Sequence, residues 1–328
     1  MSILIGGSPS TGSSLLRRML NRHPDIFCGS ETSLLSKAEL YDDWTKNKTK
    51  LLKKSFFGLS DAGWQNFTGV ALAEDYPWTK KELKPILTKS DSLVKFITTF
   101  FAKCLSENEK SLWAEKTPSN AFTFDPFLQT FGSEAKVVLT VRHPLDAISS
   151  MHNRGMTLYD SICVYLLNVA KASLLHDNTN LKIVKYEDLV SNPEMTLKSL
   201  CEFLGVAFAS SMLESNKLES GSASMKGWKS KETNPPNTKS IGRYNELPEL
   251  SKRRLMSGIE LIRNSLNPQL TQVRDIATLY KYELPPAQPI LDEDYTIFKS
   301  DMMVDKRNRR FSTAYFRSKN YPISLDRL

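Results

Sequence analysis

The chain is poor in cysteine and histidine, with four of each among its 328 residues. The cysteines stand far apart and form no C-x-x-C pair, and the histidines do not cluster with them. Structural metal sites and disulfide frameworks need such clusters. The sequence therefore predicts neither, and no metal is expected at the functional site.

Long apolar runs are also missing, since no run reaches the roughly 18 apolar residues that a membrane-spanning helix needs. The first residues read as a strand, without the basic segment and apolar core of a secretory leader. We therefore expect no membrane partner and a cytoplasmic location.

Charge is only mildly unbalanced, with 44 Lys and Arg against 36 Asp and Glu and a formal net charge of +8. Basic residues are scattered except at 306–310, and they do not interleave with aromatic residues as in RNA-binding proteins. The excess suits a small anionic ligand, and no nucleic-acid partner is expected.

The most informative stretch is 1–31. Residues 2–5 form a short apolar run, residues 6–12 are rich in Gly, Ser and Pro, and apolar positions follow helical spacing from Ser14 onward. A small-residue loop between a strand and a helix presents free backbone N–H groups and the positive end of the helix dipole. The stretch predicts a phosphate or sulfate site, although such junctions also serve packing alone.

Gly7 and Gly12 have the spacing of the nucleotide-triphosphatase phosphate loop, G-x-x-x-x-G-K-[ST]. Ser13 stands where that motif has its lysine. The lysine normally contacts the terminal phosphates, so a kinase or ATPase of this class is the weaker interpretation.

Strand and helix patterns alternate along the rest of the chain. Strands are expected at 2–5, 111–115, 136–141 and 181–184, and helices at 32–44, 80–105, 119–131, 144–154, 158–175, 193–204, 249–264 and 269–282. This order predicts an α/β fold with a parallel sheet and ligands at the carboxyl ends of its strands. Residues 7–14, Lys116, Arg142 and Tyr186 stand at those ends.

The motif Gly-x-Pro-x-x-Gly-Ser-Ser-Leu-Leu at 7–16, His23-Pro24 and Cys28–Thr32 resemble sulfotransferases that use PAPS (3′-phosphoadenosine 5′-phosphosulfate). The likeness is to the branch with tyrosylprotein sulfotransferases and many bacterial enzymes. It implies a three-layer P-loop-type fold with a central parallel sheet flanked by helices. It also implies PAPS as co-substrate and the bisphosphate PAP as product.

In that family the first loop binds the 5′-phosphosulfate, which assigns Ser10, Thr11, Gly12, Ser13 and Ser14 to the cofactor. The family usually has Arg or Lys where this chain has Ser10. Lys239, in a late segment that resembles the one closing on the cofactor, could replace that charge, and so could Arg17.

The second match is Arg142-His-Pro-Leu-Asp-Ala-Ile-Ser-Ser150. In the relatives this Arg and Ser grip the 3′-phosphate, and Arg154 aligns with a further cofactor-side arginine. Arginine suits the task because its planar fork binds phosphate at two points. The alternative is a structural ion pair between Arg142 and Asp146. Tyr186, in Tyr-Glu-Asp-Leu, lies near the nucleotide in the family, although it could also be a packing residue.

The resemblance makes Lys116 and Glu31 the catalytic pair. Lys116 corresponds to a lysine that contacts the bridging oxygen, where a cation stabilises the charge that builds on the leaving phosphate. Glu31 corresponds to the base that removes the acceptor proton. The alternatives are a surface lysine, and an acid that only stabilises a helix N-terminus. His143 and His23 could also be bases, although each precedes a proline and is mainly structural in this interpretation, and Asp25 and Glu115 are weaker candidates still.

These observations predict one sulfotransferase domain at 1–284, with a substrate-side insertion near 46–78 and a lid loop near 221–244, and a tail at 285–328 that packs on it. The expected activity is sulfuryl transfer from PAPS to a hydroxyl or nitrogen of a small-molecule acceptor. A homodimer is an open option. The alternatives are a P-loop small-molecule kinase and a non-catalytic nucleotide-binding protein.

Overall fold

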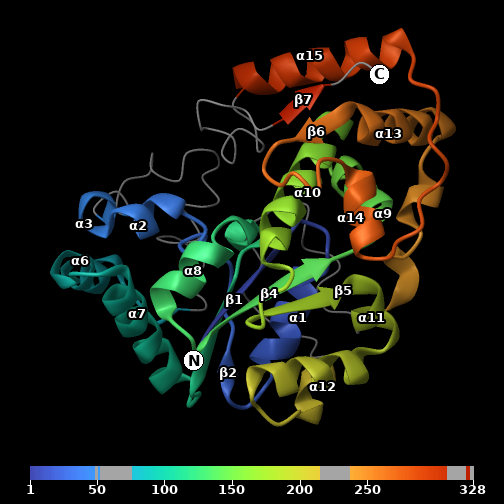
Figure 1. Cartoon of the computed structure of the whole chain (residues 1–328). Coiled ribbons are helices and arrows are strands. Elements are labelled where there is room, and N and C mark those ends of the chain that lie inside the picture. Colours follow the sequence, from blue (N-terminus) through green and yellow to red (C-terminus); the bar gives the residue numbers. More distant parts are fainter. Residues whose placement is uncertain (49–50, 52–75, 215–236, 309–322, 326–328) are drawn as a thin grey trace.

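The computed structural model describes residues 1–48, 51, 76–214, 237–308 and 323–325 (Figure 1). Most of the expected insertion at 46–78 and of the expected lid loop at 221–244 lies outside the described residues, as does part of the tail.

Five parallel strands form the central sheet, in the order β2-β3-β1-β4-β5. β1 (Ser2–Gly7) lies in the middle, between β3 (Leu112–Lys116) and β4 (Ala135–Val141). β2 (Ile26–Phe27) and β5 (Leu181–Lys185) form the two edges. Four of these strands were predicted, whereas the two-residue β2 was not.

Side chains of β1 alternate between two separate apolar cores, because successive residues of a strand point to opposite faces. Ile3 and Ile5 pack with Leu16 and Leu200 on one face, whereas Leu4 packs with the core on the other. This three-layer arrangement confirms the predicted α/β fold with helices on both faces of the sheet (Figure 1). The first face carries α1 (Ser13–Asn21), α11 (Tyr186–Ser191) and α12 (Pro193–Leu204), and the second carries α7 (Leu93–Glu107), α8 (Phe124–Phe131), α9 (Pro144–His152) and α10 (Leu158–Ala172).

The predicted helix at 32–44 is wrong. Only α2 (Ala38–Asp42) and α3 (Trp44–Asn47) form there, and Ser33 has a φ of 54°. The positive φ of Ser33 is incompatible with a right-handed helix, and side chains of β3 and the residue after it hold the backbone in this turn. The Thr32 N–H donates to Glu115 Oε1 at 3.0 Å, and the Ser33 N–H donates to Thr117 Oγ1 at 3.1 Å.

Other helix boundaries differ from the expectation for local reasons. The single helix expected at 80–105 is two, α6 (Lys80–Lys89) and α7, because the Ser92 side chain accepts a hydrogen bond from the Lys95 N–H and starts a new helix. The helix expected at 119–131 begins as the 3₁₀ turn η3 (Pro118–Phe122) before α8. The remaining 3₁₀ turns described are η4 (Ser173–Leu175), η5 (Ser210–Leu213), η6 (Thr238–Ser240) and η7 (Arg243–Glu246).

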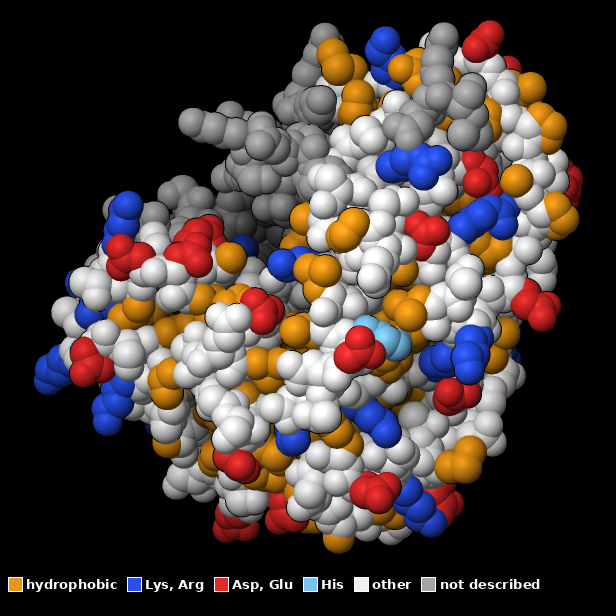
Figure 2. Space-filling model, viewed as in Figure 1, with side chains coloured by type: hydrophobic (Ala, Val, Ile, Leu, Met, Phe, Trp, Pro, Cys, Tyr) orange, Lys and Arg blue, Asp and Glu red, His pale blue; other side chains and the backbone are white. Residues whose placement is uncertain are grey.

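The C-terminal part packs on the α10 side of the domain. It contains α13 (Glu249–Leu261), α14 (Val273–Leu279), α15 (Asp292–Asn308) and an antiparallel pair of β6 (Ile262–Asn264) with β7 (Ile323–Leu325). Phe298 of α15 is buried, and Asp294 pairs with Arg253 of α13 at 2.6 Å. The end of the helix expected at 249–264 is wrong, since its last three residues form β6. On the face shown in Figure 2, basic and acidic side chains are interspersed.

Candidate active site

The candidate site lies at the carboxyl edge of the sheet, where parallel strands bring their ends together. The loop 8–12 follows β1, Lys116 ends β3, Arg142 follows β4 and Tyr186 follows β5. Glu31 follows β2, the strand that was not predicted. The structure therefore brings residues from all five strand ends to one edge.

The loop after β1 is held from inside by the Thr11 hydroxyl, which donates to the Ser8 carbonyl at 2.6 Å and lies 2.7 Å from Thr140 Oγ1. Gly12 caps α1 with a φ of 85°, and a Cβ at this position would lie 2.6 Å from the Tyr186 ring. Within the described structure α1 has no side-chain cap and no acid in its first turn. The first N–H groups of α1, which Ser13 and Ser14 begin, thus form a backbone site suited to an anion.

Arg142 joins this loop to the late segment of the chain. Its guanidinium donates to the carbonyls of Ser10, at 3.0 Å, and Ser240, and it lies 4.6 Å from the centre of the Tyr186 ring. The side chain is buried, and burial lowers its pKa. Its Nε has no hydrogen-bond partner among the described residues. A buried guanidinium with an unused donor is suited to an anionic ligand.

The alternative pairing of Arg142 with Asp146 is present only as a long contact of 3.9 Å. The Asp146 carboxylate instead accepts the N–H groups of Gly242 at 2.7 Å and Tyr244 at 2.9 Å. Asp146 therefore holds the described end of the predicted lid segment against α9.

Arg154 bridges the two predicted phosphate-binding elements. It donates to Ser10 Oγ at 2.5 Å and to Ser150 Oγ at 2.8 Å. Arg154 is exposed, yet partial desolvation, followed by the nearby charges of Arg142 and Arg243, lowers its pKa to about 10. Such a group of guanidinium charges at the end of a sheet favours anion binding.

Lys116 and Glu31 form an ion pair at the same edge. The Lys116 side chain is 1% exposed and that of Glu31 is 34% exposed, so the lysine lies beneath and the carboxylate faces outward. The lysine also donates to Ser14 Oγ, in the first turn of α1, at 3.1 Å. The two predicted catalytic groups thus lie together beside the predicted anion loop.

Among the described hydrogen bonds, neither Lys239 nor Arg17 contacts Ser10. Lys239 is exposed, and its described hydrogen bond is made by its backbone N–H to Asn237 Oδ1. Arg17 donates to the Cys28 carbonyl at 3.4 Å. Arg154 is the cation that contacts the Ser10 side chain.

Sequence reasoning gave Glu115 little weight, as a weak candidate base. Its buried carboxylate accepts hydrogen bonds from Thr32 Oγ1 at 2.9 Å, Thr117 Oγ1 at 2.7 Å and Asn120 Nδ2 at 2.5 Å, besides that from the Thr32 N–H. Burial raises the pKa of Glu115. Glu115 therefore fixes the turn that follows Glu31, and its position directly before Lys116 was the available signal.

Arg243, Glu187 and Tyr282 were also missed. Glu187 stands inside the Tyr-Glu-Asp-Leu motif that was recognised, whereas Tyr282 is 95 residues away from its partner Glu187 and no local pattern marks it. In the part of the chain that is described, no group of three His, Cys, Asp or Glu residues could hold a metal ion.

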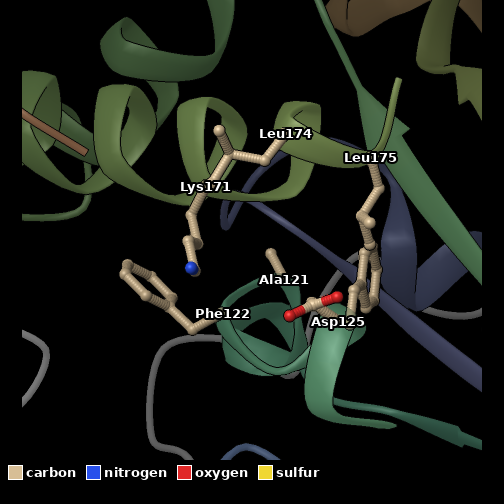
Figure 3. Close-up of a pocket in the computed structure, with 7 residues that line it drawn as sticks. Ala121, Phe122, Asp125, Lys171, Leu174 and Leu175 are labelled. Atoms are coloured by element: carbon tan, nitrogen blue, oxygen red, sulfur yellow. The ribbon is translucent and has the colours of Figure 1, made fainter. Parts of the chain in front are cut away.

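A cavity of about 240 Å³ lies apart from these residues, between η3, the start of α8 and the end of α10 (Figure 3). Figure 3 shows the Lys171 and Asp125 side chains reaching toward it from opposite sides. None of the predicted site residues is among the described residues that line it.

One described helix, Leu158–Leu175, is long and apolar enough to cross a membrane, but 83% of that window is buried within the protein, as in the core helix of many folds.

Comparisons with known proteins point to one family. The model of the sulfotransferase family matches residues 2–210. The chain is 23% identical over 228 residues to protein-tyrosine sulfotransferase 2 of Gallus gallus, a match covering 66% of this chain and 54% of that protein. It is 21% identical over 324 residues to a putative protein-tyrosine sulfotransferase of Caenorhabditis briggsae, covering 93% and 96% of the two chains.

The chain thus spans about half the length of the Gallus gallus relative, but nearly all of the Caenorhabditis briggsae one. Among solved structures, the sulfotransferase domain of the Synechococcus PCC 7002 olefin synthase has the same fold, with a TM-score of 0.60, 22% identity, and coverage of 87% of this chain and 95% of that one. The match of the family model to most of the chain shows its family: this protein is a member of the sulfotransferase family.

Proposed function

We propose that the protein transfers a sulfuryl group from PAPS to a hydroxyl or nitrogen of a small-molecule acceptor. The observation that carries this proposal is the Lys116–Glu31 pair beside Ser14, at the start of α1. It combines a buried cation, an outward-facing carboxylate and free backbone N–H groups at one point.

The described residues fit a nucleotide with two anionic ends. The amides of residues 11–14 and Lys116 would hold the 5′-phosphosulfate, and Arg142, Ser150 and Arg154 would hold the 3′-phosphate. The unpartnered Arg142 Nε and the ring of Tyr186 beside Gly12 support this assignment. PAPS, when bound, supplies the sulfuryl group and leaves as PAP.

The chain's own residues then have distinct tasks. Lys116 places a positive charge where the leaving phosphate gains negative charge, and it is already oriented by Ser14. Glu31 accepts the proton of the acceptor at its carboxylate, which is the more exposed partner. Since the two groups pair with each other, Lys116 has to exchange Glu31 for the nucleotide, and that exchange frees the carboxylate to act as a base.

Arg154 is the best-supported substitute for the cation that the family usually carries at the position of Ser10. Its guanidinium reaches both the loop hydroxyl of Ser10 and the Ser150 hydroxyl. Arg154, which follows the C-terminal end of α9, can therefore supply a positive charge to this loop without an arginine in the loop itself.

A tyrosine side chain in a protein is the second candidate acceptor, because the curated relatives are named protein-tyrosine sulfotransferases. Both acceptors need the same base and the same cation. Incubation of the protein with ³⁵S-labelled PAPS and either a metabolite extract or tyrosine-containing acidic peptides would distinguish them by which fraction becomes labelled.

The experiment that tests the proposal compares binding and turnover in one variant. Calorimetric titration should show binding of PAP in preference to ATP with Mg²⁺, the ligand of a kinase. Glu31→Gln should keep PAP binding and lose sulfuryl transfer. Binding of ATP with Mg²⁺ alone would favour the kinase, and PAP binding without transfer in the wild type would favour a non-catalytic binding protein.

A further inference from the structure

The turn at 280–283, which follows α14, contacts the ends of both β4 and β5. Lys185 Nζ donates to the Tyr280 carbonyl at 2.6 Å, and the Tyr282 hydroxyl donates to Glu187 Oε2 at 2.9 Å. The Glu283 carbonyl lies 2.9 Å from His143 Nε2. These residues of the turn lie beyond the segment 2–210 that the family model matches.

Glu187 connects this turn to the candidate phosphate site. Its second oxygen, Oε1, accepts the His143 N–H at 2.9 Å, and this N–H belongs to the peptide that joins His143 to Arg142. Glu187 also follows Tyr186, whose ring lies against the Arg142 guanidinium. The carboxylate thus holds the backbone that carries the arginine, and it is joined directly to the residue whose ring the arginine contacts.

We propose that Tyr282 is a positioning residue for nucleotide binding: through Glu187, its hydroxyl orients Arg142 and Tyr186 toward the 3′-phosphate. This inference rests on the proposed function, since that function assigns the 3′-phosphate to Arg142. It adds a residue from the C-terminal part of the chain to a site otherwise built by the β-α units.

The hydrogen bond between Tyr282 and Glu187 is strong and stays formed. A phenol that donates to a carboxylate makes a charge-assisted hydrogen bond, which is stronger than one between neutral groups. Burial and the Glu187 carboxylate hold the pKa of Tyr282 above its usual range, so the hydroxyl stays protonated and keeps donating. In Tyr282→Phe, the Glu187 carboxylate loses one of its two hydrogen-bond donors and keeps the other, the His143 N–H. Its side chain can then turn toward water.

Tyr280 offers a matched control. Its hydroxyl lies 2.7 Å from Ser173 Oγ, and its ring is buried at the same end of α14. Tyr280→Phe removes the same atom as Tyr282→Phe, two residues away, and leaves the contacts of Glu187 and Arg142 intact. Comparison of the two variants separates positioning of the phosphate site from general stability of the C-terminal part.

The test is calorimetric titration of the full-length protein with PAP and with adenosine 5′-monophosphate, which lacks the 3′-phosphate. Tyr282→Phe should weaken PAP binding about three- to ten-fold, within the roughly two- to thirty-fold range typical for residues that act through a packed network. It should leave the affinity for the monophosphate unchanged, and Tyr280→Phe should change neither affinity. Glu187→Ala should also weaken PAP binding. When Tyr282→Phe is added to that variant, the affinity for PAP should fall no further.

The outcomes are distinct. If the wild type binds PAP and Tyr282→Phe binds it equally well, the positioning role is refuted while the proposed function stands. Equal losses for PAP and the monophosphate, or equal losses in both Phe variants, would also refute it, because they indicate a general structural effect. Failure of the wild type to bind PAP would overturn the proposed function, and the inference with it.

Discussion

Replacement of Lys116 by methionine tests the catalytic assignment most directly. Methionine has a similar length and suits a buried position, so the change removes the charge with little change in packing. Glu31 loses its partner but is 34% exposed and can be hydrated in the variant. We therefore expect the free energy of unfolding to fall by only about 1 kcal/mol, as for a partly exposed ion pair.

The effect on rate should be much larger. Removal of one preorganised group that stabilises developing negative charge costs about 10²–10³-fold in kcat. Affinity for PAP should fall only about ten-fold, or about 1.4 kcal/mol, because the wild-type lysine has to give up Glu31 before it contacts the nucleotide. A larger loss in kcat than in affinity is thus the expected signature of Lys116.

Lys110→Met is the control for this experiment. Lys110 also directs its ammonium group inward, where it donates to three backbone carbonyls, those of Asn21, His23 and Ile26. These carbonyls belong to the last residue of α1, the turn after it and the first residue of β2, away from the carboxyl ends of the strands. Because Lys110→Met removes the donor of these three carbonyls, it should lower the free energy of unfolding by about 2–3 kcal/mol. It should leave kcat within about two-fold of the wild type.

The assay is the formation of PAP from PAPS, followed by ion-pair chromatography with an acceptor found by labelling, together with urea unfolding of each variant. The assignment would be refuted if Lys116→Met kept kcat within about three-fold of the wild type, far less than the loss of a preorganised charge should cost. It would also be refuted if Lys110→Met lost as much kcat, since the rate would then follow stability alone.

Three further predictions concern the same site. Glu31→Gln should lower kcat by about 10²-fold or more while PAP affinity changes little, and transfer that persists in this variant would require another base. Arg154→Met should weaken PAP binding at least about ten-fold, measured by calorimetry, whereas Lys239→Ala should leave it nearly unchanged. A larger loss of PAP affinity in Lys239→Ala than in Arg154→Met would show that Lys239 supplies the positive charge to the loop. Glu115 has a folded-state pKa raised above its unfolded value by burial, so its protonated form is favoured on folding. Between the unfolded and the folded pKa of Glu115, the stability of the wild type relative to Glu115→Gln should therefore increase as the pH is lowered, with a slope of at most about 1.4 kcal/mol per pH unit. Urea unfolding at several pH values measures this slope, and a slope of the opposite sign would contradict the prediction.

Much of the fold was readable from local patterns. The run 136–141 and the short run 2–5 are mostly apolar, without the alternation of a half-exposed strand, and both form buried parallel strands. The order of strands and helices then determines which ends meet, because parallel strands share one carboxyl edge. The convergence of the 8–14 loop, Lys116, Arg142 and Tyr186 follows from that rule alone.

Local patterns failed where distant side chains competed for the backbone. The segment after Glu31 has helical spacing, but hydrogen bonds from the Thr32 and Ser33 N–H groups to Glu115 and Thr117 accompany a positive φ at Ser33, which is incompatible with a helix there. Helix propensity amounts to tenths of a kcal/mol per residue, so a few hydrogen bonds to a buried carboxylate outweigh it.

The sequence by itself determined the small-residue loop after β1, the parallel sheet and the arginine that follows β4, since each depends on residues that are close together in the chain. Only the tertiary structure decided the partnerships: Lys116 with Glu31 across 85 residues, Tyr282 with Glu187 across 95, and Arg154 with Ser10 across 144. Such pairs are set by how helices pack on the sheet and how buried charges find partners. Neither is encoded in the spacing of any single segment.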